Sequence, residues 1–132
     1  MADAAFAVQT AIHDKLTGDA TLMATLDAVH DQVPENAAFP YLTIGEDTAV
    51  DFGTKTESGQ SLTLTLDAWS RAHGRKEVKD ILARVHALLH EQALTVAGFT
   101  HLLTRFEFTQ TFRDPDGLTQ HGVARYRIIV QG

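Results

Sequence analysis

The sequence predicts an α+β fold with one domain, a two-layer sandwich in which a mostly antiparallel four-stranded sheet carries two helices on one face. Residues Gln60–Ser70 alternate apolar and mostly polar side chains with a period of two, which is typical of a half-buried strand. Apolar residues then recur at helical spacing from Val78 to Leu89, which indicates an amphipathic helix. Further alternating segments flank this pair, and 132 residues are one domain length, so the domain is expected to span residues 1–132.

The N-terminal part predicts a helix followed by short elements. Asp3 is a suitable N-cap for a first helix, and Gly18 is a suitable residue to end it. Asp19 can cap a short second helical turn, and a brief extended piece is expected near Val29–Val33. Pro40 cannot donate a hydrogen bond to a sheet, so we expect it at the first residue or on the edge of the next strand.

A polar stretch between the two central strands predicts a long loop. From Glu46 to Gly59 there is no apolar periodicity, and long loops in compact domains are usually functional or disordered. We expect an extended arm at about 46–60 that contacts a partner. Its acidic residues would bind a divalent ion or act as an acid–base pair only if they converged in a dry pocket; a solvated loop, or one docked on a basic partner, is the alternative.

The last thirty residues predict a long β-hairpin. Two alternating segments surround the sequence Asp-Pro-Asp-Gly at 114–117, which is a strong turn signal. Its arginines could contact phosphates, or they could form exposed ion pairs across strands with Glu107 and Asp114. These arginines are Arg105, Arg113, Arg125 and Arg127.

The charge and composition narrow the class of protein. The net charge of −6 argues against a nucleic-acid-binding domain, and the absence of cysteine excludes a disulfide framework and fits a reducing compartment. No apolar run is long enough for a membrane span. Residues 1–60 carry ten acids and two bases, whereas residues 61–132 carry seven acids and nine bases. Such unlike halves suit head-to-tail self-association; charges scattered over a solvated surface are the alternative.

Motifs of catalysis are missing from the sequence. No Gly-x-Ser-x-Gly elbow or glycine-rich phosphate loop occurs. His86 and His90 have the spacing of two metal ligands on a helix, but the sequence between them lacks the glutamate of the metalloprotease motif. We predict no enzyme, no cofactor and no metal. The alternative is a small cytosolic enzyme or ligand- or metal-binding domain that uses His86, His90 and the acidic loop.

Several segments, taken in their order and spacing, resemble one family of structural proteins. They are Ala11–Leu16, Val33–Pro34, Phe39–Glu46, Lys55–Thr56 with Gly59, Leu64–Ser70, the basic helix after Gly74 and Phe112–Gly122. Together they cover nearly the whole chain and are similar to the tail completion (tail terminator, or head–tail joining) proteins of long-tailed phages and gene transfer agents.

The resemblance implies a viral tail protein, a virion subunit that forms a hexameric ring. The ring would cap the tail tube at its head-proximal end, stop tail polymerisation and join the head connector, after assembly in the cytoplasm of the bacterial host. DNA would pass through without specific binding, which an acidic lumen favours because it repels phosphates. No membrane contact is expected. The expected partner contacts are Glu46, Asp47, Asp51, Phe52, Lys55, Glu57, Arg113, Asp114 and Asp116.

Overall fold

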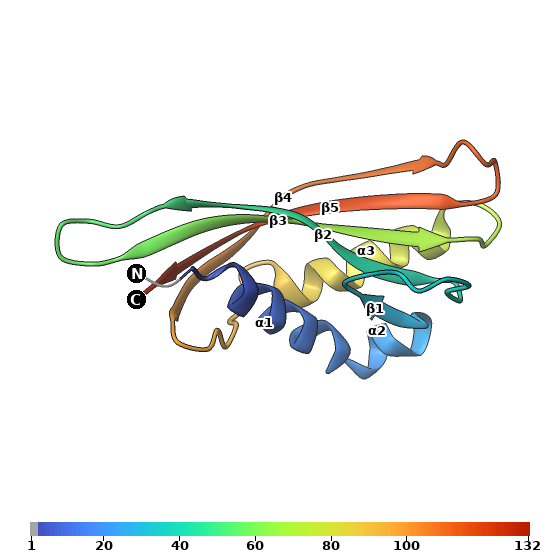
Figure 1. The fold of residues 1–132 in the computed structure, drawn as a ribbon. Coiled ribbons are helices and arrows are strands. Elements are labelled where there is room, and N and C mark those ends of the chain that lie inside the picture. Colours follow the sequence, from blue (N-terminus) through green and yellow to red (C-terminus); the bar gives the residue numbers. More distant parts are fainter. Residues whose placement is uncertain (1–2) are drawn as a thin grey trace.

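The computed structural model describes residues 3–132 and shows a five-stranded sheet with its helices on one face (Figure 1). The strand order is β1-β2-β3-β5-β4. The elements are α1 (Ala5–Thr17), α2 (Ala20–Thr25), β1 (Ala28–His30), β2 (Tyr41–Asp51), β3 (Gly59–Ser70), α3 (Lys76–Leu89), β4 (Thr100–Arg113) and β5 (Gln120–Gln131). The predicted α+β class is confirmed.

The prediction of four strands and two helices was wrong in detail. β1 adds a fifth strand and makes the sheet mixed, because it pairs in parallel with the first three residues of β2. It covers only part of the extended piece expected near Val29–Val33, and α2 is a third helix. A strand of three residues shows no alternation in the sequence, so its pairing with β2 is what defines it.

β3 is the centre of the sheet and of the core. It pairs in antiparallel fashion with β2 on one side and with β5 on the other along its whole length. Its apolar alternate residues face the helices and are buried, as the period of two predicted: Leu62, Leu64, Leu66 and Ala68. α1 packs under β1 and β2, while α3 packs under β3, β5 and β4. Among the described residues, no helix is long and apolar enough to cross a bilayer.

α3 approaches β5 most closely at a glycine. A Cβ atom added at Gly122 would lie 2.8 Å from Cγ2 of Val78 and 2.9 Å from Cδ1 of Leu82. Both distances are below ordinary van der Waals contact, and both partners are buried in the core. The absence of a side chain at Gly122 therefore sets how deeply the helix lies against the sheet.

Of the two N-terminal helices, only α2 has a side-chain N-cap. Asp3 accepts a hydrogen bond from the Ala5 N–H at 2.9 Å, although α1 itself begins after Ala4, one residue later than expected. Gly18 ends α1 and Asp19 caps α2, as predicted.

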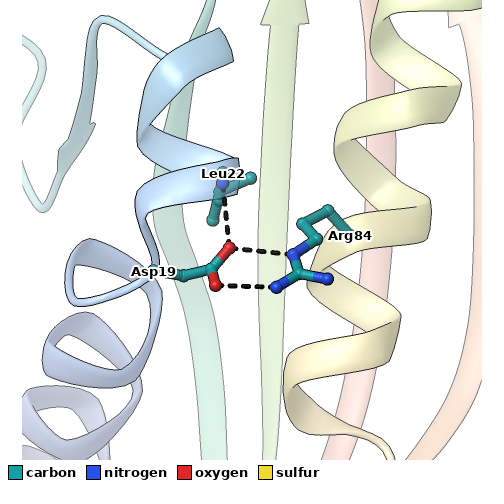
Figure 2. Close-up of polar contacts among 3 residues, drawn as sticks. All are labelled: Asp19, Leu22 and Arg84. Atoms are coloured by element: carbon teal, nitrogen blue, oxygen red, sulfur yellow. Dashed lines mark hydrogen bonds and ion pairs between the residues drawn. The ribbon is translucent and has the colours of Figure 1, made fainter.

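Asp19 also connects α2 with α3 (Figure 2). Its carboxylate accepts the Leu22 N–H at 2.8 Å and receives two hydrogen bonds from the Arg84 guanidinium, at 2.8 and 2.7 Å. The pKa of Asp19 is lowered from 3.8 to about 2, chiefly by the Arg84 hydrogen bond, against the opposing effect of burial. The sequence pattern placed Arg84 on the solvent side of its helix and did not indicate this pairing.

We expect Gly122→Ala to lower the free energy of unfolding by about 1–3 kcal/mol, because the added methyl group overlaps α3 side chains. Chemical denaturation measures the loss. The same substitution made together with Val78→Ala should cost less, because one of the two overlapping side chains is shortened. Equal losses in both backgrounds would contradict the close approach.

We expect Asp19→Asn to reduce the acid sensitivity of the fold. A carboxylate whose folded pKa is lowered stabilises the fold above its unfolded pKa, near 3.8, and this contribution is lost as pH falls towards about 2. Thermal unfolding from pH 5 to pH 2 should show a smaller decline for the variant than for wild type. In an Arg84→Met background, Asp19→Asn should change the acid-induced decline in stability only slightly. If its effect there were as large as in wild type, the lowered pKa of Asp19 would be caused by a group other than Arg84.

Candidate partner-binding surfaces

The arm predicted at about 46–60 is a β-hairpin that projects past the C-terminus at one end of the sheet (Figure 1). The expected long loop was wrong in extent: β2 continues to Asp51, and only residues 52–58 form the connecting loop. The loop is closed by backbone hydrogen bonds from Phe52 N–H to the Gly59 carbonyl, at 2.9 Å, and from Thr54 N–H to the Glu57 carbonyl, at 2.7 Å. Alternation fails here because both faces of this part of β2 are exposed.

Two large apolar side chains lie exposed on the arm. Val50 is 61% exposed and Phe52 is 56% exposed, and neither belongs to the core. Their neighbours Asp51, Lys55 and Glu57 are also exposed. Exposed apolar side chains with charged neighbours are typical of protein–protein contact sites, and these two residues do not contribute to the core.

The structure does not bring the nine expected contact residues together. Those of the arm lie at one end of the sheet, whereas Arg113, Asp114 and Asp116 lie in or beside the β4–β5 turn at the other end (Figure 1). They therefore form two separate surfaces and not one continuous patch.

Within the first group, Glu46 and Asp47 are separate from the arm tip. They lie where the β2–β3 register shifts, and they line a hollow of about 400 Å³ on the sheet face away from the helices. Arg125 and Arg127 line the same hollow, so these acids face bases of their own chain.

Three of the four hairpin arginines are engaged within the chain. Arg127 forms an ion pair with Glu107 at 3.1 Å, and Arg105 lies 3.9 Å from Glu91. The Arg125 guanidinium lies over the Phe108 ring, 4.6 Å from its centroid. The ion-pair alternative from the sequence therefore describes Arg127, which pairs with Glu107 as expected, and Arg105, whose partner is Glu91 in place of Glu107 or Asp114.

The β4–β5 turn is fixed by one of its expected contact residues. Asp116 accepts hydrogen bonds from the N–H groups of Leu118 and Thr119, at 2.8 and 2.9 Å, and from the Thr119 hydroxyl at 2.7 Å. These bonds lower the pKa of Asp116, with the Thr119 backbone contribution the largest. Gly117 has a φ of 74°, which a turn of this kind requires. Asp116 thus has a structural role, whether or not it also touches a partner.

A row of aromatic side chains lies near this turn, on the face of the sheet away from the helices. Four strands each contribute one ring, from β2 through β3 and β5 to β4, and neighbouring rings are in contact. The rings belong to Tyr41, Trp69, His121 and Phe112. His121 Nε2 also lies 2.7 Å from an Asp67 carboxylate oxygen. The strands were predicted, but this row depends on their order, which the sequence pattern does not specify.

The histidine pair on α3 has a structural function. The His86 and His90 rings stack with centroids 4.7 Å apart. His90 Nδ1 accepts the backbone N–H of Phe106 at 3.0 Å, where β4 contains a bulge. Within residues 3–132, no group of three or more His, Cys, Asp or Glu side chains could hold a metal ion. The Nδ1 atom of His90 is thus already bonded to a backbone N–H at the edge of β4.

The outer edge of β4 is covered in the middle of the strand and is open towards the β4–β5 turn. Glu91 N–H donates to the Thr104 carbonyl at 2.8 Å, and His90 accepts from Phe106. In an antiparallel pair, the backbone groups of alternate residues point away from the partner strand. Thr104 and Phe106 are two such residues of β4, and the alternation continues beyond them. Its further members, with their β5 partners, are Thr109 (Ala124), Thr111 (Gly122) and Arg113 (Gln120). No hydrogen bond from another described residue reaches the backbone of Thr109 or Thr111 on this side.

Beside this open edge, α3 and β4 enclose a groove of about 550 Å³. Its lining is apolar at Leu82, Ala83 and Phe106, and it includes Lys79 but no acid. The outer edge of β2 is open in the same way, because β1 covers only Tyr41–Thr43 and no described residue pairs with the edge beyond them. Sequence reasoning missed both open edges and the groove, since alternation does not reveal which strands lie outermost.

Comparisons with known proteins agree with this architecture. The model of the family "Tail completion protein gp17" matches residues 10–131. Tail completion protein gp17 of Bacillus phage SPP1 is 29% identical over 124 residues, covering 94% of this chain and 92% of that protein. The solved structure of bacteriophage SPP1 gp17 superposes with a TM-score of 0.65 at 28% identity, covering 92% of this chain and 87% of that one.

A chain in the virion of a native gene transfer agent particle shares the fold in full. It has a TM-score of 0.91 and 24% identity, with complete coverage of both chains. The family resemblance that the sequence motifs predicted is confirmed by the family model and by the SPP1 relative. The chain belongs to the tail completion protein gp17 family.

Proposed function

We propose that the protein assembles into a ring, most simply a hexamer, that caps the tail tube of a phage or gene transfer agent. The cap would end polymerisation of the tube and present the surface that joins the head connector. The protein would then lie in the virion at the head-proximal end of the tail, after assembly in the cytoplasm of the bacterial host. Membership of the tail completion family supports this role, and it supports a structural function in place of catalysis.

The observation that carries the proposal is the presence of two unlike contact surfaces at opposite ends of one sheet. The arm presents apolar and acidic side chains, whereas the other end presents the β4–β5 turn with Arg113 and the aromatic row. A subunit at a joint needs different faces for different neighbours. The nine expected contact residues divide between these two ends, which suits one neighbour at each end.

The charge of the chain is compatible with a channel for DNA. The net charge of −6 disfavours retention of a polyphosphate, and Arg105 and Arg127 are opposed by acids of the same chain. The proposed passage of DNA through the ring therefore involves no specific binding.

The test is negative-stain imaging of tail tubes mixed with the purified protein. Wild type should place one collar at one end of each tube and stop its elongation. A short-arm variant, in which Gly53–Ser58 is replaced by Asn-Gly and Phe52 by Ala, should fold normally and form no collars, because the arm is shortened and lacks its exposed aromatic side chain. The replacement retains the backbone pairing of residue 52 with Gly59, so circular dichroism and the Tm should stay near wild type.

The matched control is Phe6→Ala, which truncates an exposed aromatic residue on α1, outside both the arm and the β4–β5 turn. It should form collars as wild type does. Collars with the short-arm variant would remove the arm from the contact, and wild-type protein that never decorates tubes would overturn the capping role.

A further inference from the structure

We propose that the open edge of β4 and the adjacent α3–β4 groove form the docking site for the arm of a second copy of this chain. Residues Asp47–Asp51 of one copy would add a strand beside Thr109–Arg113 of the next, and Phe52 would enter the groove. This inference rests on the proposed self-association, to which it adds the contact that joins neighbouring subunits.

The backbone supplies the first argument. Both segments are five residues long, and neither has a strand partner on its outer side among the described residues. Exposed strand edges carry unpaired N–H and C=O groups that readily pair with another strand. Other parts of each edge are covered, by β1 beside Tyr41–Thr43 and by His90 and Glu91 beside Phe106 and Thr104. These two segments are therefore open stretches of backbone that can pair with another strand.

The side chains supply the second argument. Phe52 is an exposed aromatic residue at the end of the arm, and the groove offers Leu82, Ala83 and Phe106 beside the open edge. A ring that leaves water for such a groove is the type of anchor that dominates interface energetics. Segment 51–57 carries two acids and one base, while the groove contributes Lys79 and no acid, so their charges are complementary.

The geometry requires the contact to be between copies. In the order β1-β2-β3-β5-β4, the arm's open edge and the open edge of β4 lie on opposite sides of the sheet with β3 and β5 between them. They also lie towards opposite ends, because Asp51 is level with Gln60 and Val130 whereas Arg113 is level with Gln120. A chain cannot place its own arm on its own β4. Docking from a neighbour is head-to-tail, and such an interface can repeat around a closed ring.

Two variants separate the two halves of the contact. Thr111→Pro removes an N–H that points away from β5, so it should block strand addition while leaving the β4–β5 pairing intact. Its matched control is Thr111→Ala, which keeps that N–H. Phe52→Ala removes the anchor on the arm, with Phe6→Ala as the control for loss of an exposed aromatic residue. Circular dichroism and Tm confirm that each variant folds.

Self-association is measured by chemical cross-linking and analytical ultracentrifugation. Phe52→Ala and Thr111→Pro should each weaken it by at least about tenfold, the effect expected for loss of a buried interface anchor, whereas both controls should match wild type. A mixture of the two defective variants should form heterodimers and nothing larger, because one intact edge meets one intact arm. Normal rings from either variant alone, or a mixture without heterodimers when wild type assembles, would overturn the proposal.

A second measurement applies where subunits associate only on tail tubes. The chain contains no cysteine, so copies with Phe52→Cys and Thr109→Cys can be mixed on tubes and oxidised. A disulfide should join the two variants, and copies with Phe52→Cys and Phe6→Cys should not be joined. Collars without the first cross-link would leave the capping role standing and reject the arm as the subunit contact. If neither collars nor cross-links form, both proposals fail.

Discussion

The period-two alternation along β3 is the constraint on which the other elements depend. Its leucines must be buried, and the helices bury them from one face, so the opposite face of the strand remains free of helices. Since β3 pairs along its whole length with β2 and with β5, this single strand fixes the direction of both hairpins. The arm and the β4–β5 turn consequently emerge at opposite ends of one rigid sheet.

Some stretches of the two sheet edges are covered by other parts of the chain, and others are open. β1 covers the start of β2, and the segment that leaves α3 covers the middle of β4 through His90 and Glu91. Exposed edges promote unwanted pairing, so proteins usually cover or disrupt them. Here short stretches are left open at diagonally opposite places. That arrangement is a liability for a protein that works alone and is useful for one that assembles in a fixed direction.

Several charged side chains are already paired with, or lie close to, opposite charges of the same chain. Asp19 is engaged by Arg84, and Glu107 by Arg127, while Glu46 and Asp47 face a hollow that their own arginines line. Exposed ion pairs contribute little stability individually, but they neutralise residues that would otherwise attract nonspecific partners. The charges that remain for recognition are therefore fewer than the composition suggests.

The sequence by itself determined the α+β class, the central strand and helix, the final hairpin with its turn, and the family, because these depend on local periodicity, turn chemistry and ordered motifs. The tertiary structure alone decided that β1 joins the sheet in parallel and that β2 continues to Asp51. It also decided that His90 caps a strand edge and that the expected contact residues lie on two separate surfaces. These features depend on which strand lies beside which, and long-range pairing leaves no periodic trace in either partner.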